Sequence, residues 1–184
     1  MSPGPIPKPP PGSLTPWRPG ERTRWPAWAG TTALFPWAWL PARDGLPNGG
    51  VRRSAPAPNC SYFVNWTSTD DRILWAVDIH TAGHYEVTMH YTCAEPDAGS
   101  TVEISLGDSR LQGEVAPAWD PPLITDQDVI PRPRAESMLK EFRPLPLGKM
   151  RLEQGRGELT LRALRVAGKE VMHLRGVTLT LLPP

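Results

Sequence analysis

Two histidines and two carboxylates lie close together in the sequence and supply the residue types that bind metal ions. His80 and His84 flank the tripeptide at 81–83, with Asp78 and Glu86 two residues further out. If the tripeptide closes a hairpin, His80 faces His84 and Asp78 faces Glu86 on one outer surface. If the flanking strands enter opposite sheets, the four groups never meet. Even paired strands leave the alternative of a solvated face whose acids and imidazoles compensate one another's charge.

A second candidate site is the segment 117–134, PAWDPPLITDQDVIPRPR, which is too long for a hairpin loop. Loops of this length are usually functional or disordered. An aromatic ring beside several acids is typical of a sugar-recognition loop or a structural calcium site, and arginine suits the paired oxygens of a sulfate group. The candidate binding residues are Trp119, Asp120, Asp126, Asp128, Arg132 and Arg134. The alternative is a solvent-exposed lid between two strands.

The two cysteines, Cys60 and Cys93, fit no paired zinc spacing and no C-x-x-C redox motif. In an exported protein they would close a disulfide loop of about 33 residues, which stabilises by roughly 3 to 4 kcal/mol. In a cytosol they would be two small buried apolar side chains. The sequence leaves both alternatives open.

The patterns that mark common enzyme classes are absent from the sequence. There is no G-x-S-x-G elbow, and Gly49 and Gly50 precede VRR without the G-K-[ST] ending of a phosphate loop. Asp70 and Asp71 cannot by adjacency alone supply the separated carboxylates of a glycoside hydrolase. We therefore predict no catalytic residue in this chain and no cofactor beyond the calcium ion considered above.

Charge and hydropathy exclude two classes of partner. Twenty basic residues stand against nineteen acidic ones, a net charge of +1, whereas nucleic-acid binding needs a concentrated excess of Lys and Arg. Every apolar run is short, and a membrane-spanning helix needs about 20 apolar residues. The first residues, MSPGPIPKPPPG, lack the basic and apolar regions of a secretory signal, so no signal peptide is expected in this chain.

The elements that must position these side chains are short strands, because apolar residues recur at every second position from residue 59 onward. The two clearest strands carry the inward-facing residues Ile73, Trp75, Val77, Ile79, Tyr85, Val87, Met89 and Tyr91. Further strands are predicted at 101–106, 110–115, 142–147, 150–153, 159–166 and 171–182, and a helical turn only at 134–140. Such a pattern predicts an all-β fold, a jelly-roll or galactose-binding-like antiparallel β-sandwich.

The chain divides by composition into an arm and a domain. Residues 1–33 are rich in Pro and Trp and follow neither strand nor helix periodicity, which predicts an extended Pro-rich N-terminal arm or linker. Its tryptophans either pack on this or a neighbouring domain or offer stacking platforms to a sugar. Residues 34–184 are the predicted β-sandwich domain.

Several runs of the sequence together resemble one protein family. They are LPARDG (40–45), NGGVRRS (48–54), NCSYFVNWTSTDD (59–71), AGHYEVTMHYTC (82–93), GSTVEISLGDSRLQGEV (99–115) and GRGELTLRAL (155–164). They resemble the C-terminal accessory region of bacterial sulfatases of the N-acetylgalactosamine-6-sulfatase or arylsulfatase type, as found in planctomycete-like bacteria. The resemblance covers residues 34–182. The shorter pattern A-G-x-Y-x-V-x-x-x-Y at 82–91 is also similar to a central strand of galactose-binding-type sandwiches such as carbohydrate-binding modules.

The resemblance implies an accessory domain without the family's catalysis. The sulfatase nucleophile arises within C-x-P-S-R, and neither Cys60 nor Cys93 is followed by that pattern. The implied partners are a sulfatase catalytic domain and a sulfated polysaccharide, and the implied location is secreted or periplasmic. A purely structural module without a ligand is the first alternative. A small metal-dependent hydrolase that uses His80, His84, Asp78 and Glu86 is the second.

Overall fold

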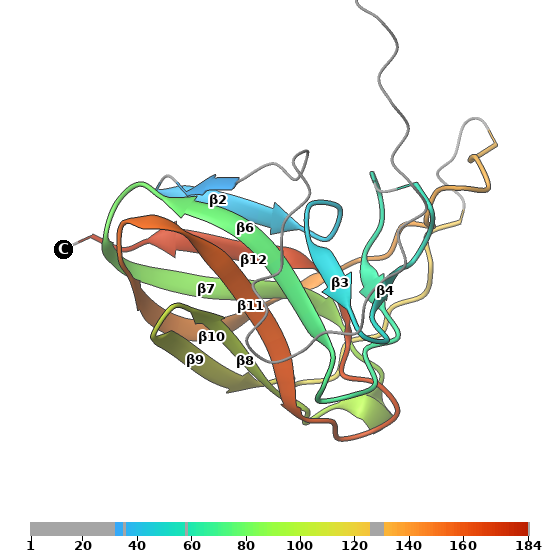
Figure 1. Cartoon of the computed structure of the whole chain (residues 1–184). Coiled ribbons are helices and arrows are strands. Elements are labelled where there is room, and N and C mark those ends of the chain that lie inside the picture. The colour runs from blue at the N-terminus through green and yellow to red at the C-terminus, as the bar shows by residue number, and fades with distance from the viewer. Residues whose placement is uncertain (1–31, 35, 58, 126–130, 184) are drawn as a thin grey trace, which may run out of the picture.

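The computed structural model describes residues 32–34, 36–57, 59–125 and 131–183 of the chain, and these form two stacked β-sheets (Figure 1). Sheet A has the strand order β1-β6-β11-β8-β9, with β3 also paired to β6. Its strands are β1 (Thr32–Leu34), β3 (Leu46–Asn48), β6 (Arg72–Ile79), β8 (Thr101–Leu106), β9 (Ser109–Glu114) and β11 (Gly155–Arg165). All its pairs are antiparallel except the parallel pair β1–β6.

Sheet B has the strand order β10-β7-β12-β5-β4, with β2 also paired to β12, and all its pairs are antiparallel. Its strands are β2 (Trp37–Pro41), β4 (Arg52–Arg53), β5 (Phe63–Val64), β7 (Gly83–Thr92), β10 (Arg143–Leu152) and β12 (His173–Leu181). From β6 to β12 the chain crosses between the sheets at every connection except β8–β9, as in a jelly roll. The predicted all-β sandwich is confirmed.

The core lies between the two sheets and is built by the predicted alternation of side chains. The eight residues predicted to face inward are each exposed by 1% or less: Ile73, Trp75, Val77, Ile79, Tyr85, Val87, Met89 and Tyr91. Trp75 is also fixed by its indole N–H, which donates to the Pro41 carbonyl at 3.0 Å. The inward faces of β6 and β7 were therefore predicted correctly.

Of the two arrangements considered for these strands, the structure has the one in which they enter opposite sheets. β6 lies in sheet A against β11, whereas β7 lies in sheet B between β10 and β12. The three residues 80–82 form an arch from one sheet to the other instead of a hairpin. This arrangement lets both apolar faces meet across the core, so each strand buries its face against the opposite sheet.

Other predicted elements differ in detail. β10 is one continuous strand that passes through a bulge between Pro146 and Gly148, where two strands were expected. The helical turn lies at η1 (Glu95–Asp97), where Pro96 stands in the first turn and presets its backbone. Within 134–140 the chain makes only a turn, closed by the Glu136 N–H donating to the Pro133 carbonyl at 3.0 Å.

The boundary between arm and domain falls slightly earlier than expected. Strand β1 begins at Thr32 and pairs with β6, so residues 32 and 33 already belong to sheet A. Residues 1–31, and with them the tryptophans of the predicted arm, lie outside the described residues. In the described part of the chain, no helix has the length and apolar character needed to cross a membrane.

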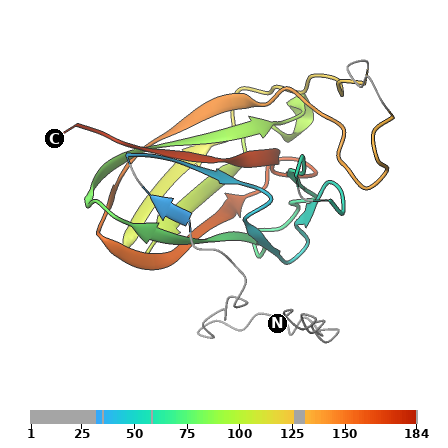
Figure 2. The ribbon, with the colours of Figure 1, turned by 90° about the horizontal axis from the view of Figure 1, so that it is seen from above.

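Most of the long connections meet at one end of the sandwich, which we call the loop end. Strands β6, β8, β10 and β12 begin there, so the connections 65–71, 93–100, 115–142 and 166–172 lie together. The opposite end carries the short turns at 80–82, 107–108 and 153–154. Figure 2 shows the described parts of the 115–142 connection, 115–125 and 131–142, at the loop end, reaching away from the two sheets. Loops gathered on a rigid sandwich are a common position for binding residues.

Candidate functional site

Two tryptophans stand side by side on the outer face of sheet B. On β2, Trp37 and Trp39 are two residues apart and so project to the same side of the strand, while Ala38 between them and Leu40 face the core. Register places Trp37 opposite Thr180 and Trp39 opposite Thr178 of β12. The two indoles therefore lie next to a row of threonine hydroxyls on the solvent side of the sheet.

Trp39 is held in a fixed position by its neighbours. Its indole lies over Gly176, where an added methyl carbon would come within 2.6 Å of the ring. The His90 ring meets it edge-on, with centroids 4.9 Å apart and planes at 88°. His90 is in turn bound through Nε2 to Thr178 Oγ1 at 3.0 Å, and burial lowers the pKa of His90, which favours its neutral form. The ring is thus ordered before any ligand arrives.

Trp37 completes this surface as an exposed ring. It is 61% exposed, and in the described part of the chain only Leu123, at 45%, is another large apolar side chain with such exposure. A large aromatic ring left in water on a folded surface is a common sign of a contact site. We call the surface formed by Trp37, Trp39, His90, Thr178 and Thr180 the tryptophan face.

A small polar pocket opens at the loop end of the same outer face. It has a volume of about 40 Å³ and is lined by Thr92, Cys93, Ala94, Asp97, Asp120, Glu170, Met172 and His173. Thr92 and His173 pair across β7 and β12 at outward-facing positions, so this pocket continues the face that carries Trp39. Along β12, Thr178 and His173 are roughly 15 Å apart, given about 3.3 Å of rise per residue.

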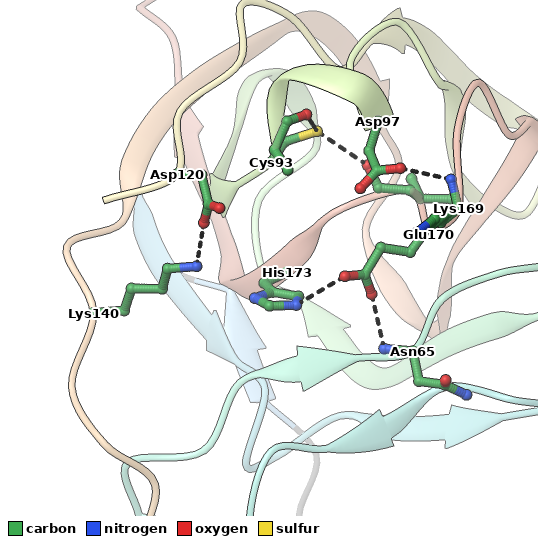
Figure 3. A network of polar contacts seen from close by, with 10 residues as sticks. Asn65, Cys93, Asp97, Asp120, Lys140, Lys169, Glu170 and His173 are labelled. Atoms are coloured by element: carbon green, nitrogen blue, oxygen red, sulfur yellow. Dashed lines mark hydrogen bonds and ion pairs between the residues drawn. The ribbon is translucent and has the colours of Figure 1, made fainter. Parts of the chain in front are cut away.

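The acids of the pocket are held by specific contacts (Figure 3). Asp97 Oδ1 accepts the Lys169 backbone N–H at 2.6 Å, and Asp120 Oδ1 accepts from Lys140 Nζ at 2.5 Å. Glu170 accepts from His173 Nε2 at 3.1 Å and from the Asn65 backbone N–H at 3.2 Å. The hydrogen bond from His173 contributes most to lowering the pKa of Glu170, so that carboxylate is charged at neutral pH.

Two buried polar atoms of the pocket lining have no hydrogen-bond partner among the residues that the structure describes. They are the Thr92 hydroxyl Oγ1 and the His173 ring nitrogen Nδ1. Buried polar atoms are usually paired, and an unpaired one costs about 1 to 3 kcal/mol. Both atoms belong to residues that line the pocket and retain unused hydrogen-bonding capacity.

The cysteines do not form the disulfide considered above. Cys60 and Cys93 are free thiols, Cys60 partly exposed and Cys93 buried. The Cys93 thiol lies against the carbonyls of Ala94 and Val171, with sulfur–oxygen distances of 3.5 and 3.6 Å. Burial, with smaller contributions from nearby carboxylates led by Asp97, raises the pKa of Cys93 to about 11, so the thiol is a poor nucleophile.

Trp119 of the predicted binding loop is built into the framework. Its backbone exchanges hydrogen bonds with Cys93 at 2.7 and 2.8 Å, and its indole N–H donates to the Glu141 carbonyl at 3.1 Å. The Arg143 guanidinium lies 4.5 Å from the centre of the ring and covers one of its faces. The indole therefore anchors the loop, and the free aromatic ring lies elsewhere, at Trp37.

The other residues predicted in this loop are dispersed. Asp120 lines the loop-end pocket, whereas Arg132 donates to the Ser137 carbonyl at 3.0 Å and Arg134 is exposed. Asp126 and Asp128 lie outside the described residues. Of the described members of this group, Asp120 is the one that lines the pocket.

The predicted metal cluster does not form, because its members belong to different sheets. Asp78 lies on β6 and binds Arg156 of β11 at 2.8 Å, while His84 and Glu86 lie on β7 in sheet B. His80 lies on the arch between them. Among the residues that the structure describes, no group of three or more His, Cys, Asp or Glu side chains is arranged to hold a metal ion.

Comparison with known proteins finds likeness in structure only. No family model matches the sequence, and no curated protein matches it. A β-(1,4)-mannanase of the GH26-CBM35 type from Podospora anserina matches with TM-score 0.54 and 16% identity over 80% of this chain and 28% of that chain. The Cry4Aa mosquito-larvicidal toxin of Bacillus thuringiensis matches with TM-score 0.59 and 9% identity over 84% of this chain and 25% of that chain.

A carbohydrate-binding module of Cellvibrio mixtus lichenase 5A, solved in complex with cellotriose, matches over nearly its whole length. The TM-score is 0.52 and the identity 13%, over 79% of this chain and 98% of that chain. This chain spans about a quarter of the mannanase and of the toxin. At such identities the likeness establishes the jelly-roll fold alone, and the toxin shows that this fold also occurs in a protein of another kind.

Proposed function

We propose that the chain is a noncatalytic module that binds a carbohydrate on the tryptophan face of sheet B. The observation that carries this proposal is Trp37, an exposed ring beside the preorganised Trp39. One side of a sugar ring presents C–H groups that pack on an aromatic surface, while its hydroxyls need polar partners. The hydroxyls of Thr178 and Thr180 lie next to the indoles and can supply such partners.

The contacts of Asp71 and Cys93 support a noncatalytic role. The Asp71 carboxylate accepts the backbone N–H groups of Gly50, Thr67 and Ser68 at 2.6 to 3.2 Å and thereby fixes two loops. Cys93 is held as a neutral thiol, as described above. The cellotriose complex of the Cellvibrio mixtus module shows that a jelly roll of this kind can serve as a sugar-binding module.

Affinity electrophoresis tests the proposal directly. The purified chain is run in native gels that contain laminarin, mannan, hydroxyethylcellulose or chondroitin sulfate. We expect retardation by at least one polysaccharide, and loss of that retardation in Trp37→Ala. A chain that no glycan retards is a purely structural module and contradicts the proposal.

We further propose, on the sequence resemblance alone, that the module accompanies an exported sulfatase and that its glycan is sulfated. Arg134, exposed in the connection that also carries Asp120, offers a guanidinium to a sulfate group. Two measurements test this. Chondroitin sulfate should retard the chain more than its desulfated form does. A C-x-P-S-R motif should be encoded in the same gene or in a neighbouring gene. Equal retardation by the two forms contradicts the proposal, and so does a neighbouring gene whose product has an unrelated activity.

A further inference from the structure

The loop-end pocket is rich in hydrogen-bond acceptors. Asp97, Asp120 and Glu170 contribute three carboxylates, and Lys140, bound to Asp120, is the cation that the described contacts place beside them. Three carboxylates against the one ammonium of Lys140 give these four side chains a formal charge of −2, an excess that a protonated His173 would reduce but not cancel. Its charge therefore disfavours a sulfate or carboxylate group and favours a cation.

The two unpartnered atoms also favour a donor. Thr92 is only 1% exposed, lines the pocket, and its hydroxyl has lone pairs that no described group uses. Neutral His173 must carry its proton on Nε2 in order to donate to the Glu170 carboxylate, which leaves Nδ1 as an acceptor. The Thr92 hydroxyl can thus accept a hydrogen bond from an entering group, and so can His173 Nδ1 when the ring is neutral.

The size of the pocket limits what can enter. A volume of about 40 Å³ holds roughly three water molecules, so a functional group fits and a sugar ring does not. Figure 3 shows Cys93, Asp120, Glu170 and His173 around one common space. A primary ammonium carries three donors and no acceptor, and this matches a small space surrounded by acceptors.

We propose that this pocket binds the primary ammonium group of an amino sugar whose chain lies along the tryptophan face. This inference rests on the proposed function for the position of the glycan, because pocket and tryptophan face belong to the same side of sheet B. The Trp37 and Trp39 rings bind the sugar chain, and Thr92, Glu170 and His173 select a residue that bears a free amine.

Three tetrasaccharides with the same β-1,4 linkage and different groups at carbon 2 test the proposal by calorimetry. The glucosamine tetramer carries an amine, cellotetraose a hydroxyl, and the N-acetylglucosamine tetramer a neutral amide. We expect the glucosamine tetramer to bind about tenfold or more tighter than the other two, as one charge-assisted hydrogen bond would produce. A net charge of +1 gives the chain no general attraction for a polycation.

Glu170→Gln and Thr92→Val should each reduce this preference from tenfold, which corresponds to 1.4 kcal/mol, to threefold or less. Each variant keeps the size of the original side chain, and thermal denaturation shows whether it folds. The matched control is Glu153→Gln, which removes an exposed carboxylate paired with Arg151 at the opposite end of the sandwich. The control should leave the preference unchanged.

The outcomes separate this inference from the proposed function. Equal affinity for all three tetramers overturns the ammonium subsite and leaves glycan binding intact. Free glucosamine that shifts the NMR signals of Thr92 and His173, with no binding of cellotetraose, retains the subsite and leaves the tryptophan face to be decided by the affinity gels. No binding of any tetramer and no shift with glucosamine overturns the subsite, and the tryptophan face is overturned as well if no polysaccharide retards the chain.

Discussion

Replacement of Trp37 by alanine measures what the exposed ring contributes to binding. A tryptophan presents up to about 250 Å², so at 61% exposure Trp37 leaves about 150 Å² in water. A sugar that covers one face removes about half of this, roughly 75 Å², which at about 25 cal/mol per Å² stabilises the complex by about 1.9 kcal/mol. Trp37→Ala should therefore weaken binding about 20-fold.

Calorimetry with an oligosaccharide of the polysaccharide that retards the chain in gels is the assay. Because Trp37 lies on the surface, its loss should change the free energy of unfolding by about 0.5 kcal/mol or less, and urea denaturation checks this. Leu123→Ala is the control, since Leu123 is also a large exposed apolar residue but lies in the 115–142 connection. Unchanged affinity in Trp37→Ala, or an equal loss in Leu123→Ala, would refute the reasoning.

Three further predictions concern stability and reactivity. Gly176→Ala should shift β2 and Trp39, because the new methyl would lie 2.5 Å from the Leu40 carbonyl oxygen and 2.6 Å from the indole. This should destabilise the fold by about 1 to 3 kcal/mol and lower the melting temperature in a thermal scan. At pH 8 only about one Cys93 thiol in a thousand should be ionised. Iodoacetamide should therefore modify the partly exposed Cys60 first in the folded protein. Mass spectrometry after partial labelling shows the order. Burial lowers the pKa of His90 below its unfolded value of about 6.5, so the unfolded chain binds the proton more tightly. The contribution of His90 is thus present above pH 6.5 and declines as the pH falls through the folded pKa, and His90→Gln should flatten the dependence of unfolding free energy on pH between about 5 and 7.

The longer strands were predictable because their side-chain period is strong. β7 alternates large apolar and polar residues over ten positions, and in β6 large side chains recur at every second position on the inward face. That period identifies the inner face but not the neighbouring strand. Three residues between the strands suit a hairpin as well as an arch between sheets, so the pairing, and with it the expected metal cluster, could not be decided locally.

Strands β1 to β5 were missed because each has only two to five residues and prolines interrupt the region. Their stability comes from pairing with distant strands, since β2 pairs with β12 and β3 with β6. Such short segments hold too few alternations to define a period. The Trp-Ala-Trp run at 37–39 did carry a usable signal, because residues two apart on a strand share a face.

The loop-end pocket was only partly accessible to sequence reasoning. Asp120 was expected to contact a ligand, since it follows an aromatic residue in a long acidic loop. Thr92, Glu170 and His173 come from the end of β7 and from the entry to β12, and only the pairing of these two strands brings them together. No spacing in the sequence indicates that the end of β7 pairs with the start of β12.

The most direct test of glycan binding on the outer face of sheet B is an NMR titration of isotope-labelled protein with the oligosaccharide that calorimetry selects. The shifted signals should map to β2, β7 and β12, with Trp37, Trp39 and Thr178 among the largest changes. Shifts confined to β6, β8 and β11 of sheet A, or no shift with any glycan, would contradict the account.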